Sequence, residues 1–76
     1  SDLYQLNEDV DFIIADGQGN EMIPLSTASV ERVYEFNEDD ILSSSNESRS
    51  VRNRMHEEVV RQILNRLRVF SDNAKP

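Results

Sequence analysis

The sequence has few of the residues that cross-link or bend small domains. Its 76 residues include no cysteine, no tryptophan, one histidine, two glycines and two prolines. Without cysteine no disulfide can form, and one histidine gives no basis for a structural zinc site. So short a chain buries only a modest fraction of its surface. Because it lacks these supplements, we expect it to depend on oligomerisation or on further sequence for stability.

Long apolar runs are also missing. The sequence has no stretch of about 18 apolar residues that would predict a transmembrane helix. We also find no basic-then-apolar signal peptide at its start. Targeting signals therefore do not identify a cellular compartment.

Basic residues are scarce in the first part of the chain. The net charge is −7, and no nucleic-acid partner is expected. Residues 1–47 carry twelve acids and one base, whereas residues 48–76 carry three acids and seven bases. Attraction between the two parts within one fold explains this division most simply.

Alternating apolar residues predict a first strand over about 3–15, with one buried face interrupted by Glu8. The segment 16–20 combines two glycines with aspartate and asparagine, which favours a hairpin turn. A second strand is predicted over about 22–37, with Val30 on one face, Ile23, Leu25 and Val33 on the other, and both faces partly covered. Since Pro24 cannot donate a ladder hydrogen bond, regular pairing is expected from about Ser26 onward.

The rest of the chain predicts one long amphipathic helix. Residues 38–44 are expected to form a loop in which Ile41 and Leu42 fold over the core, and Ser44 with Glu47 fits a capping box. The helix is predicted over about 45–70, followed by a frayed tail, 71–76. The expected fold class is α+β: an antiparallel hairpin and a helix packed on it, within one partial domain, 1–76. The apolar helix positions lie three or four residues apart: Val51, Met55, Val59, Val60, Ile63, Leu64, Leu67 and Phe70.

No catalytic pattern is complete. His56 and Glu57 begin a zinc-protease motif, but the second histidine is replaced by Val60. The acidic clusters lack the spacing of a calcium loop, and the serines at 43–45 are explained by cap chemistry. We therefore expect no enzyme activity, no metal site and no cofactor.

Three arginines, Arg49, Arg52 and Arg54, lie near the predicted helix start, where the helix dipole disfavours positive charge. They are candidates for an anion-binding patch, since guanidinium groups pair with phosphate and carboxylate in bidentate geometry. The alternative is pairing with acids nearby in the sequence. Those acids are Asp39, Asp40 and Glu47.

The order of these features resembles the LptE family of lipopolysaccharide-assembly lipoproteins, also known as rare lipoprotein B. The resemblance rests on the strand exit at 34–37, the Ile41-Leu42 and Asn46-Glu47 segments, and the helix from Met55 to Leu67. It covers only the C-terminal half of the family pattern. The signal peptide, lipidated cysteine, first strand and first helix of family members are absent here. The resemblance implies a sandwich of two helices against a β-sheet.

The resemblance also implies a function. The protein would sit at the periplasmic face of the Gram-negative outer membrane, inside the β-barrel LptD, helping lipopolysaccharide reach the cell surface without catalysis. Its membrane association would come from a lipid anchor that this chain lacks. Family members also bind lipopolysaccharide, and Arg52 and Arg54 lie nearest the family's basic helix start. Here the charge is rearranged, because Asn53 replaces a base and Arg54 an acid.

An alternative is a small soluble adaptor that dimerises through the apolar helix face at Val59, Ile63 and Leu67. In the family interpretation the same stripe packs on the chain's own sheet. The sequence that precedes Ser1 in the parent protein would distinguish the two.

Overall fold

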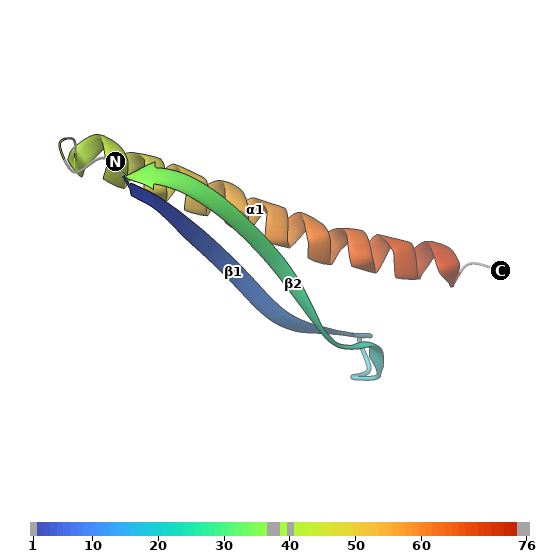
Figure 1. Cartoon of the computed structure of the whole chain (residues 1–76). Helices are drawn as coiled ribbons and strands as arrows, with labels where there is room; N and C mark the ends of the chain where they lie inside the picture. The colour runs from blue at the N-terminus through green and yellow to red at the C-terminus, as the bar shows by residue number, and fades with distance from the viewer. Residues whose placement is uncertain (1, 37–38, 40, 75–76) are drawn as a thin grey trace.

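The structure is a computed structural model that describes residues 2–36, 39 and 41–74. Two antiparallel strands, β1 (Asp2–Ala15) and β2 (Glu21–Phe36), form a hairpin, and the helix α1 (Ile41–Asn73) lies along one of its faces (Figure 1). The molecule is a slender rod of 58 × 20 × 17 Å. The predicted α+β arrangement of hairpin and long helix is confirmed. The described residues form one helix, so the second helix of the expected sandwich stays a prediction.

Asp16 organises the turn between the strands. Its carboxylate accepts hydrogen bonds from the backbone N–H of Gln18 at 2.8 Å and of Asn20 at 2.9 Å, and from the Asn20 side chain at 3.0 Å. These bonds, above all the one from the Asn20 side chain, favour the ionised carboxylate and lower the pKa of Asp16. Gly19 has a φ of 87°, which glycine adopts without strain.

A bulge at Pro24 changes the face to which β2 side chains point. Phe12 pairs with Ser26 and Ile14 pairs with Ile23, so β2 contains one residue more than β1 in this interval. Regular pairing runs from Ser26 to the end of β2, as predicted. The extra residue brings Ile23, which is 3% exposed, to the buried face.

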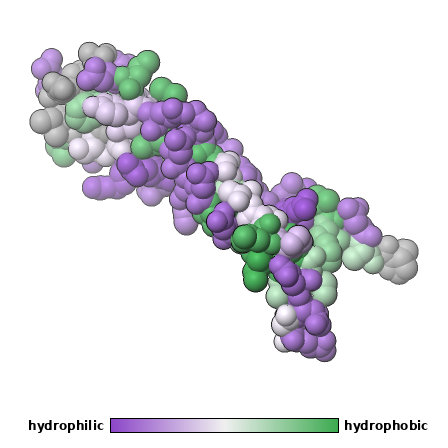
Figure 2. Space-filling view, turned by 60° about the horizontal axis from the view of Figure 1, so that its bottom comes forward, coloured by the Kyte–Doolittle hydropathy of each residue, from purple (hydrophilic) through white to green (hydrophobic). Residues whose placement is uncertain are grey.

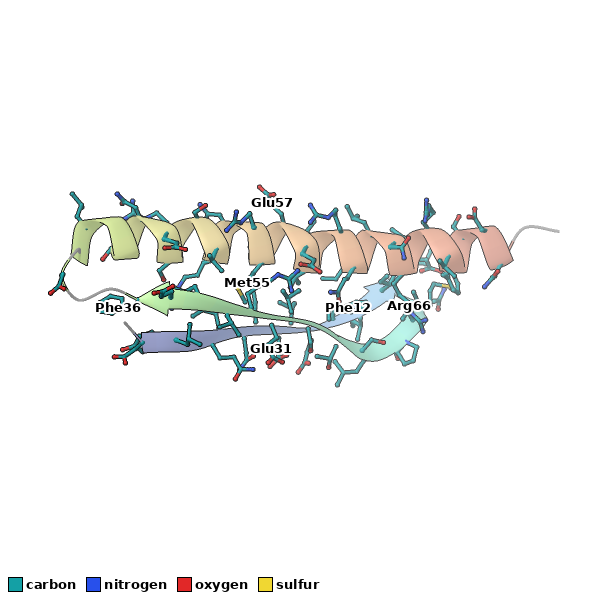
Figure 3. All side chains as sticks on the ribbon, turned by 45° about the horizontal axis from the view of Figure 1, so that its top comes forward. Phe12, Glu31, Phe36, Met55, Glu57 and Arg66 are labelled. Carbon is teal, nitrogen blue, oxygen red and sulfur yellow. The ribbon has the colours of Figure 1, made fainter. Side chains whose placement is uncertain are left out.

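Only one face of the hairpin is covered within the described residues. Met55 and Phe12 lie between the helix and the strands (Figure 3). Glu57 points outward from the side of α1 that faces away from the hairpin, and Glu31 points outward from the side of the hairpin that faces away from α1. Leu25 is 70% exposed and Val33 is 62% exposed. The expectation that both faces are partly covered is therefore wrong here, because α1 packs on a single side.

The core is a narrow row of side chains between helix and sheet. Val59 is 1% exposed and Met55 is 3% exposed, and they pack over Ala28 and Val30 of β2. The small side chain of Ala28 leaves room for the helix to approach the strand. At the end of the rod near Phe36, Tyr4 stacks on Tyr34 with ring centroids 5.7 Å apart.

The helix extends beyond both predicted ends. It begins at Ile41 instead of about 45 and ends at Asn73 instead of Phe70. Ser44 and Glu47 therefore lie inside the helix, and the predicted capping box does not start it. Leu42 is 75% exposed, so it does not fold over the core as expected. Acids at 38–40 precede the observed start in the sequence, where negative charge suits the helix dipole.

The stripe proposed for dimerisation is largely used inside the molecule. Val59 is fully buried and Ile63 is half-buried against the core, while Leu67 remains 41% exposed. A dimer formed through Val59 and Ile63 would require the helix to leave its own sheet. The interpretation of this stripe as core is confirmed for Val59 and Ile63 and is wrong for Leu67, and the dimer interpretation is not supported.

Candidate functional site

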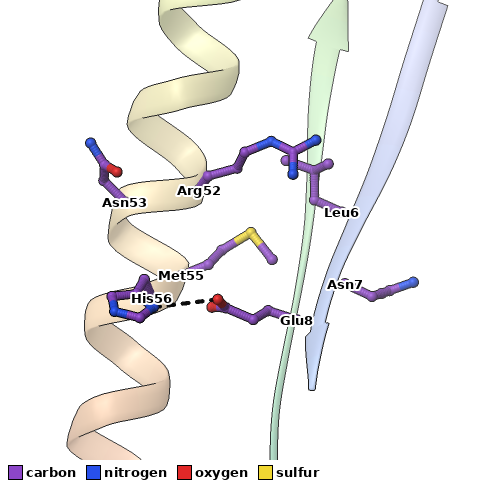
Figure 4. A pocket seen from close by; sticks show the side chains of 7 residues that line it. All are labelled: Leu6, Asn7, Glu8, Arg52, Asn53, Met55 and His56. Carbon is purple, nitrogen blue, oxygen red and sulfur yellow. Dashed lines mark hydrogen bonds and ion pairs between the residues drawn. The ribbon is translucent and has the colours of Figure 1, made fainter. Parts of the chain in front are cut away.

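A hollow of about 300 Å³ lies where α1 passes beside β1 (Figure 4). Arg52 and His56 enter it from the helix, and Leu6 and Glu8 enter it from the strand. Asn7, Asn53 and Met55 complete the lining. The hollow thus combines one guanidinium group, one imidazole, one carboxylate and two apolar side chains. We call this side of the helix the β1 flank.

Glu8 interrupts the apolar face of β1 and points toward α1. Its Oε1 atom lies 3.4 Å from Nδ1 of His56, and the His56 side chain is 70% exposed. Its Oε2 atom is buried and has no hydrogen-bond partner within the described residues. A buried carboxylate oxygen without a donor is costly, so the hollow has an unused acceptor.

The opposite side of the helix carries a second group of charges, beside β2. Arg54 and Arg61 lie there next to Glu57 and Glu58 in a hollow of about 400 Å³. Arg32 of β2 reaches the same place and pairs with Glu58. We call this side the β2 flank. Its acids offset part of its positive charge.

The structure separates the three candidate arginines. Arg52 lies on the β1 flank and Arg54 lies on the β2 flank. Arg49 precedes Arg52 by three residues, which puts both on neighbouring positions of one helix face. Among residues 2–36, 39 and 41–74, none of the three forms an ion pair with an acid. The alternative of local acidic partners is therefore not supported for Asp39 and Glu47, whereas Asp40 lies outside the described residues.

The earlier helix start changes the argument for an anion patch. Arg49 is the ninth residue of a helix that begins at Ile41, whereas the dipole acts mainly within the first turn. These arginines therefore do not oppose the dipole as expected. Anion binding stays a prediction, which now depends on their exposure and on the lack of an ion-pair partner within the described residues.

Sequence reasoning missed the contact between Glu8 and His56. Glu8 is identifiable as the one acid on an apolar strand face, but His56 lies 48 residues away and shares no local pattern with it. No group of three or more metal-ligating side chains occurs in the described part of the chain. Within the same residues, α1 is too polar to be a membrane-spanning helix.

Comparison with known proteins identifies the family to which this chain is similar. Residues 1–67 match the family described as LptE, lipopolysaccharide-assembly. No curated protein and no solved structure matches the chain significantly. Members of the family act in lipopolysaccharide assembly at the outer membrane, as components without enzymatic activity. Because the match covers most of its 76 residues, the chain belongs to the LptE family of lipopolysaccharide-assembly proteins.

Proposed function

We propose that this chain forms the part of an outer-membrane lipoprotein that lodges inside a large β-barrel partner of the LptD type. It acts at the periplasmic face of a Gram-negative outer membrane, as a plug and assembly factor for lipopolysaccharide transport. Attachment to the membrane comes from a lipid anchor. In this proposal the hairpin and α1 belong to a sandwich with a second helix.

The shape of the molecule is the observation that best supports the plug. The rod measures 20 × 17 Å across and 58 Å along its axis. Barrels of about 22 strands enclose a lumen that holds a plug. An elongated body with a single file of core residues can enter such a lumen lengthwise and present both helix flanks to the barrel wall.

Co-purification tests the partnership. The tagged full-length lipoprotein, extracted in mild detergent, is expected to retain its barrel partner at near-equal stoichiometry. An unrelated outer-membrane lipoprotein with the same tag serves as the control and should not retain that barrel. Recovery of the tagged protein without any outer-membrane barrel would contradict the proposal.

The arginines give the proposal a ligand site. The phosphates of lipopolysaccharide suit the unpaired guanidinium groups of Arg49, Arg52 and Arg54. Arg49 and Arg52 share the β1 flank and can approach one phosphate group together. Arg54 shares its flank with Glu57 and Glu58, whose charges weaken an anion site. We therefore assign the larger share of lipopolysaccharide binding to Arg49 and Arg52.

Alanine substitution distinguishes the two flanks. The double variant Arg49→Ala, Arg52→Ala is expected to bind lipopolysaccharide more weakly by about fivefold per arginine, which corresponds to about 1 kcal/mol for an exposed ion pair. Arg54→Ala, as the matched control, should change the affinity less. The measurement is a titration at fixed ionic strength, repeated with dephosphorylated lipopolysaccharide. Unchanged affinity in the double variant removes these arginines from the site.

A further inference from the structure

The face of the hairpin that α1 leaves uncovered has an acidic middle. We call it the outer sheet face, and its exposed members are Leu3, Gln5, Asn7, Asp9, Asp11, Ile13, Leu25, Thr27, Ser29, Glu31, Val33 and Glu35. Glu31 pairs with Asn7, two residues from Asp9, and Asp11 lies two residues further along β1. The face carries four acids and no base among its members.

The outer side of α1 carries a row of arginines. Arg54, Arg61 and Arg68 are seven residues apart, so they project from one side of the helix at intervals of about 10.5 Å. Glu57 lies between the first two, points away from the hairpin in Figure 3, and offsets part of their charge. Arg68 donates to the neutral side chain of Asn65 at 2.6 Å. Within the described residues none of the three arginines forms an ion pair.

The outer sheet face and the arginine row match in sign and in length. The row spans fourteen residues of helix, or about 21 Å. The acids extend from Glu35, which pairs with Leu3, to Asp11, eight residues further along β1, or about 26 Å. The two surfaces lie on opposite sides of one copy of the chain. They can therefore meet only between copies.

The outer sheet face does not suit a further helix of the same fold. A helix packs on a sheet through a continuous apolar stripe. Here the apolar members lie at the two ends, Leu3 and Val33 at one and Ile13 and Leu25 at the other, with the polar middle between them. Figure 2 shows hydrophilic side chains along the middle of the rod. The arginine row faces away from the sheet, so a helix packed beside α1 on that sheet would not cover it.

Charge selects one arrangement of two copies. Contact between two outer sheet faces would bring acids together, and contact between two arginine rows would bring arginines together, both of which are unfavourable. The arginine row of one copy on the outer sheet face of the next brings opposite charges together. This head-to-back contact leaves one surface of each kind free at the ends, so it can repeat.

Size and burial agree with such a contact. The rod is 58 Å long and 17–20 Å across, so one face exceeds the area of about 800 Å² per partner that a stable interface buries. The contact would cover exposed apolar side chains on both surfaces, such as Val33 at 62% and Leu64 at 57%. It would also supply the oligomeric support that a chain of 76 residues without disulfides needs.

We propose that the outer sheet face binds the arginine row of a second copy of this chain, so that the chain forms an open head-to-back stack. The contact leaves Val59 and the packing inside each copy unchanged. The inference goes beyond the proposed function, because it concerns the chain without its barrel partner.

Charge reversal tests the stack by sedimentation velocity. The mean mass of the parent chain is expected to rise with concentration beyond that of a dimer of the 8.8 kDa chain. The row variant, Arg54→Glu with Arg61→Glu, makes both surfaces acidic. The face variant, Asp9→Lys with Asp11→Lys and Glu31→Lys, makes both basic. Each variant alone should associate at least about tenfold more weakly, at an ionic strength of about 0.15 M where long-range repulsion is screened.

An equimolar mixture of the row variant and the face variant should associate again, because each supplies the surface that the other lacks. Arg49→Glu with Arg52→Glu is the matched control, since it makes the same change in net charge on the β1 flank, and it should associate like the parent chain. Circular dichroism checks folding. Arg61→Ala and Asp9→Ala, each expected to weaken association about threefold to fivefold, replace any variant that unfolds.

The face variant also probes the full-length lipoprotein in mild detergent, because its intact arginine row should bind an open outer sheet face there. Absence of binding would assign that face to the lipoprotein's own remaining segments and overturn the proposal. So would a monomeric parent chain, a closed dimer that does not grow, a mixture that stays dissociated, or equal weakening in the control. Loss of the barrel in co-purification leaves these outcomes unchanged, so the two proposals fail separately.

Discussion

Val59→Asp is expected to abolish the cooperative thermal transition of this chain. Val59 is 1% exposed at the centre of the contact between α1 and β2, and aspartate there would be a buried charge without a partner. A change of this kind costs about 3–5 kcal/mol or more. A single core in a domain of this length rarely supplies more than about 3–5 kcal/mol of stability, so most of it would be lost.

The measurement is thermal unfolding followed by far-ultraviolet circular dichroism. Leu42→Asp is the matched control, because Leu42 lies on the same helix and is 75% exposed. Its melting temperature should stay close to that of the parent chain, since exposed substitutions change the stability by about 0.5 kcal/mol or less. A Val59→Asp protein that melts like the Leu42→Asp protein would falsify the packing of α1 on the hairpin.

Met55→Ala is the second large effect that we expect. Met55 is 3% exposed and points from α1 into the row of core side chains, as Figure 3 shows. Removing its side chain leaves a cavity and costs about 2–5 kcal/mol. For a domain of this size the melting temperature should fall by at least about 10 °C.

Two further variants separate packing from helix propensity. Met55→Leu conserves the volume and should cost less than about 1.5 kcal/mol. Leu64→Ala makes a similar truncation at a position that is 57% exposed, and its effect should be small. Equal destabilisation by Met55→Ala and Leu64→Ala would show that burial does not set the cost.

Much of the fold could be predicted because its signals are local. Alternation along Leu6, Val10 and Phe12 identifies a strand with one buried face, and the four-residue spacing of Val51, Met55 and Val59 identifies the helix face that packs on it. The face of Ile23 was not predictable from alternation alone, because the bulge at Pro24 inserts one residue and reverses the parity. Pro24 itself signalled that a bulge could occur there.

The prediction of where the helix begins was wrong for a different reason. Ser44 and Glu47 fit a cap, but side chains of these types also occur within helices, so the motif alone does not fix where a helix begins. The helix continues back to Ile41. Where a helix begins also depends on the helix propensity of the residues that precede the capping motif.

The placement of Arg52 and Arg54 on opposite sides of the helix could be predicted from the sequence. Arg52 and Arg54 are two positions apart, which corresponds to about 200° around a helix, so the two side chains leave on opposite sides. Which of them faces β1 was not readable, because that depends on the rotation of α1 about its axis over the sheet. The contact between Glu8 and His56 depends on the same rotation and on the register of helix against strand.

The row of core side chains has a mechanical consequence. In a globular core buried residues are stacked in several layers, whereas here Met55 and Val59 belong to a single layer between α1 and the hairpin that extends along the rod. Stability is therefore distributed along a line, and loosening at one end is not transmitted far. The hairpin tip and the far turns of α1 can flex or separate while the centre stays closed, so the molecule can adjust its ends to a surface without unfolding.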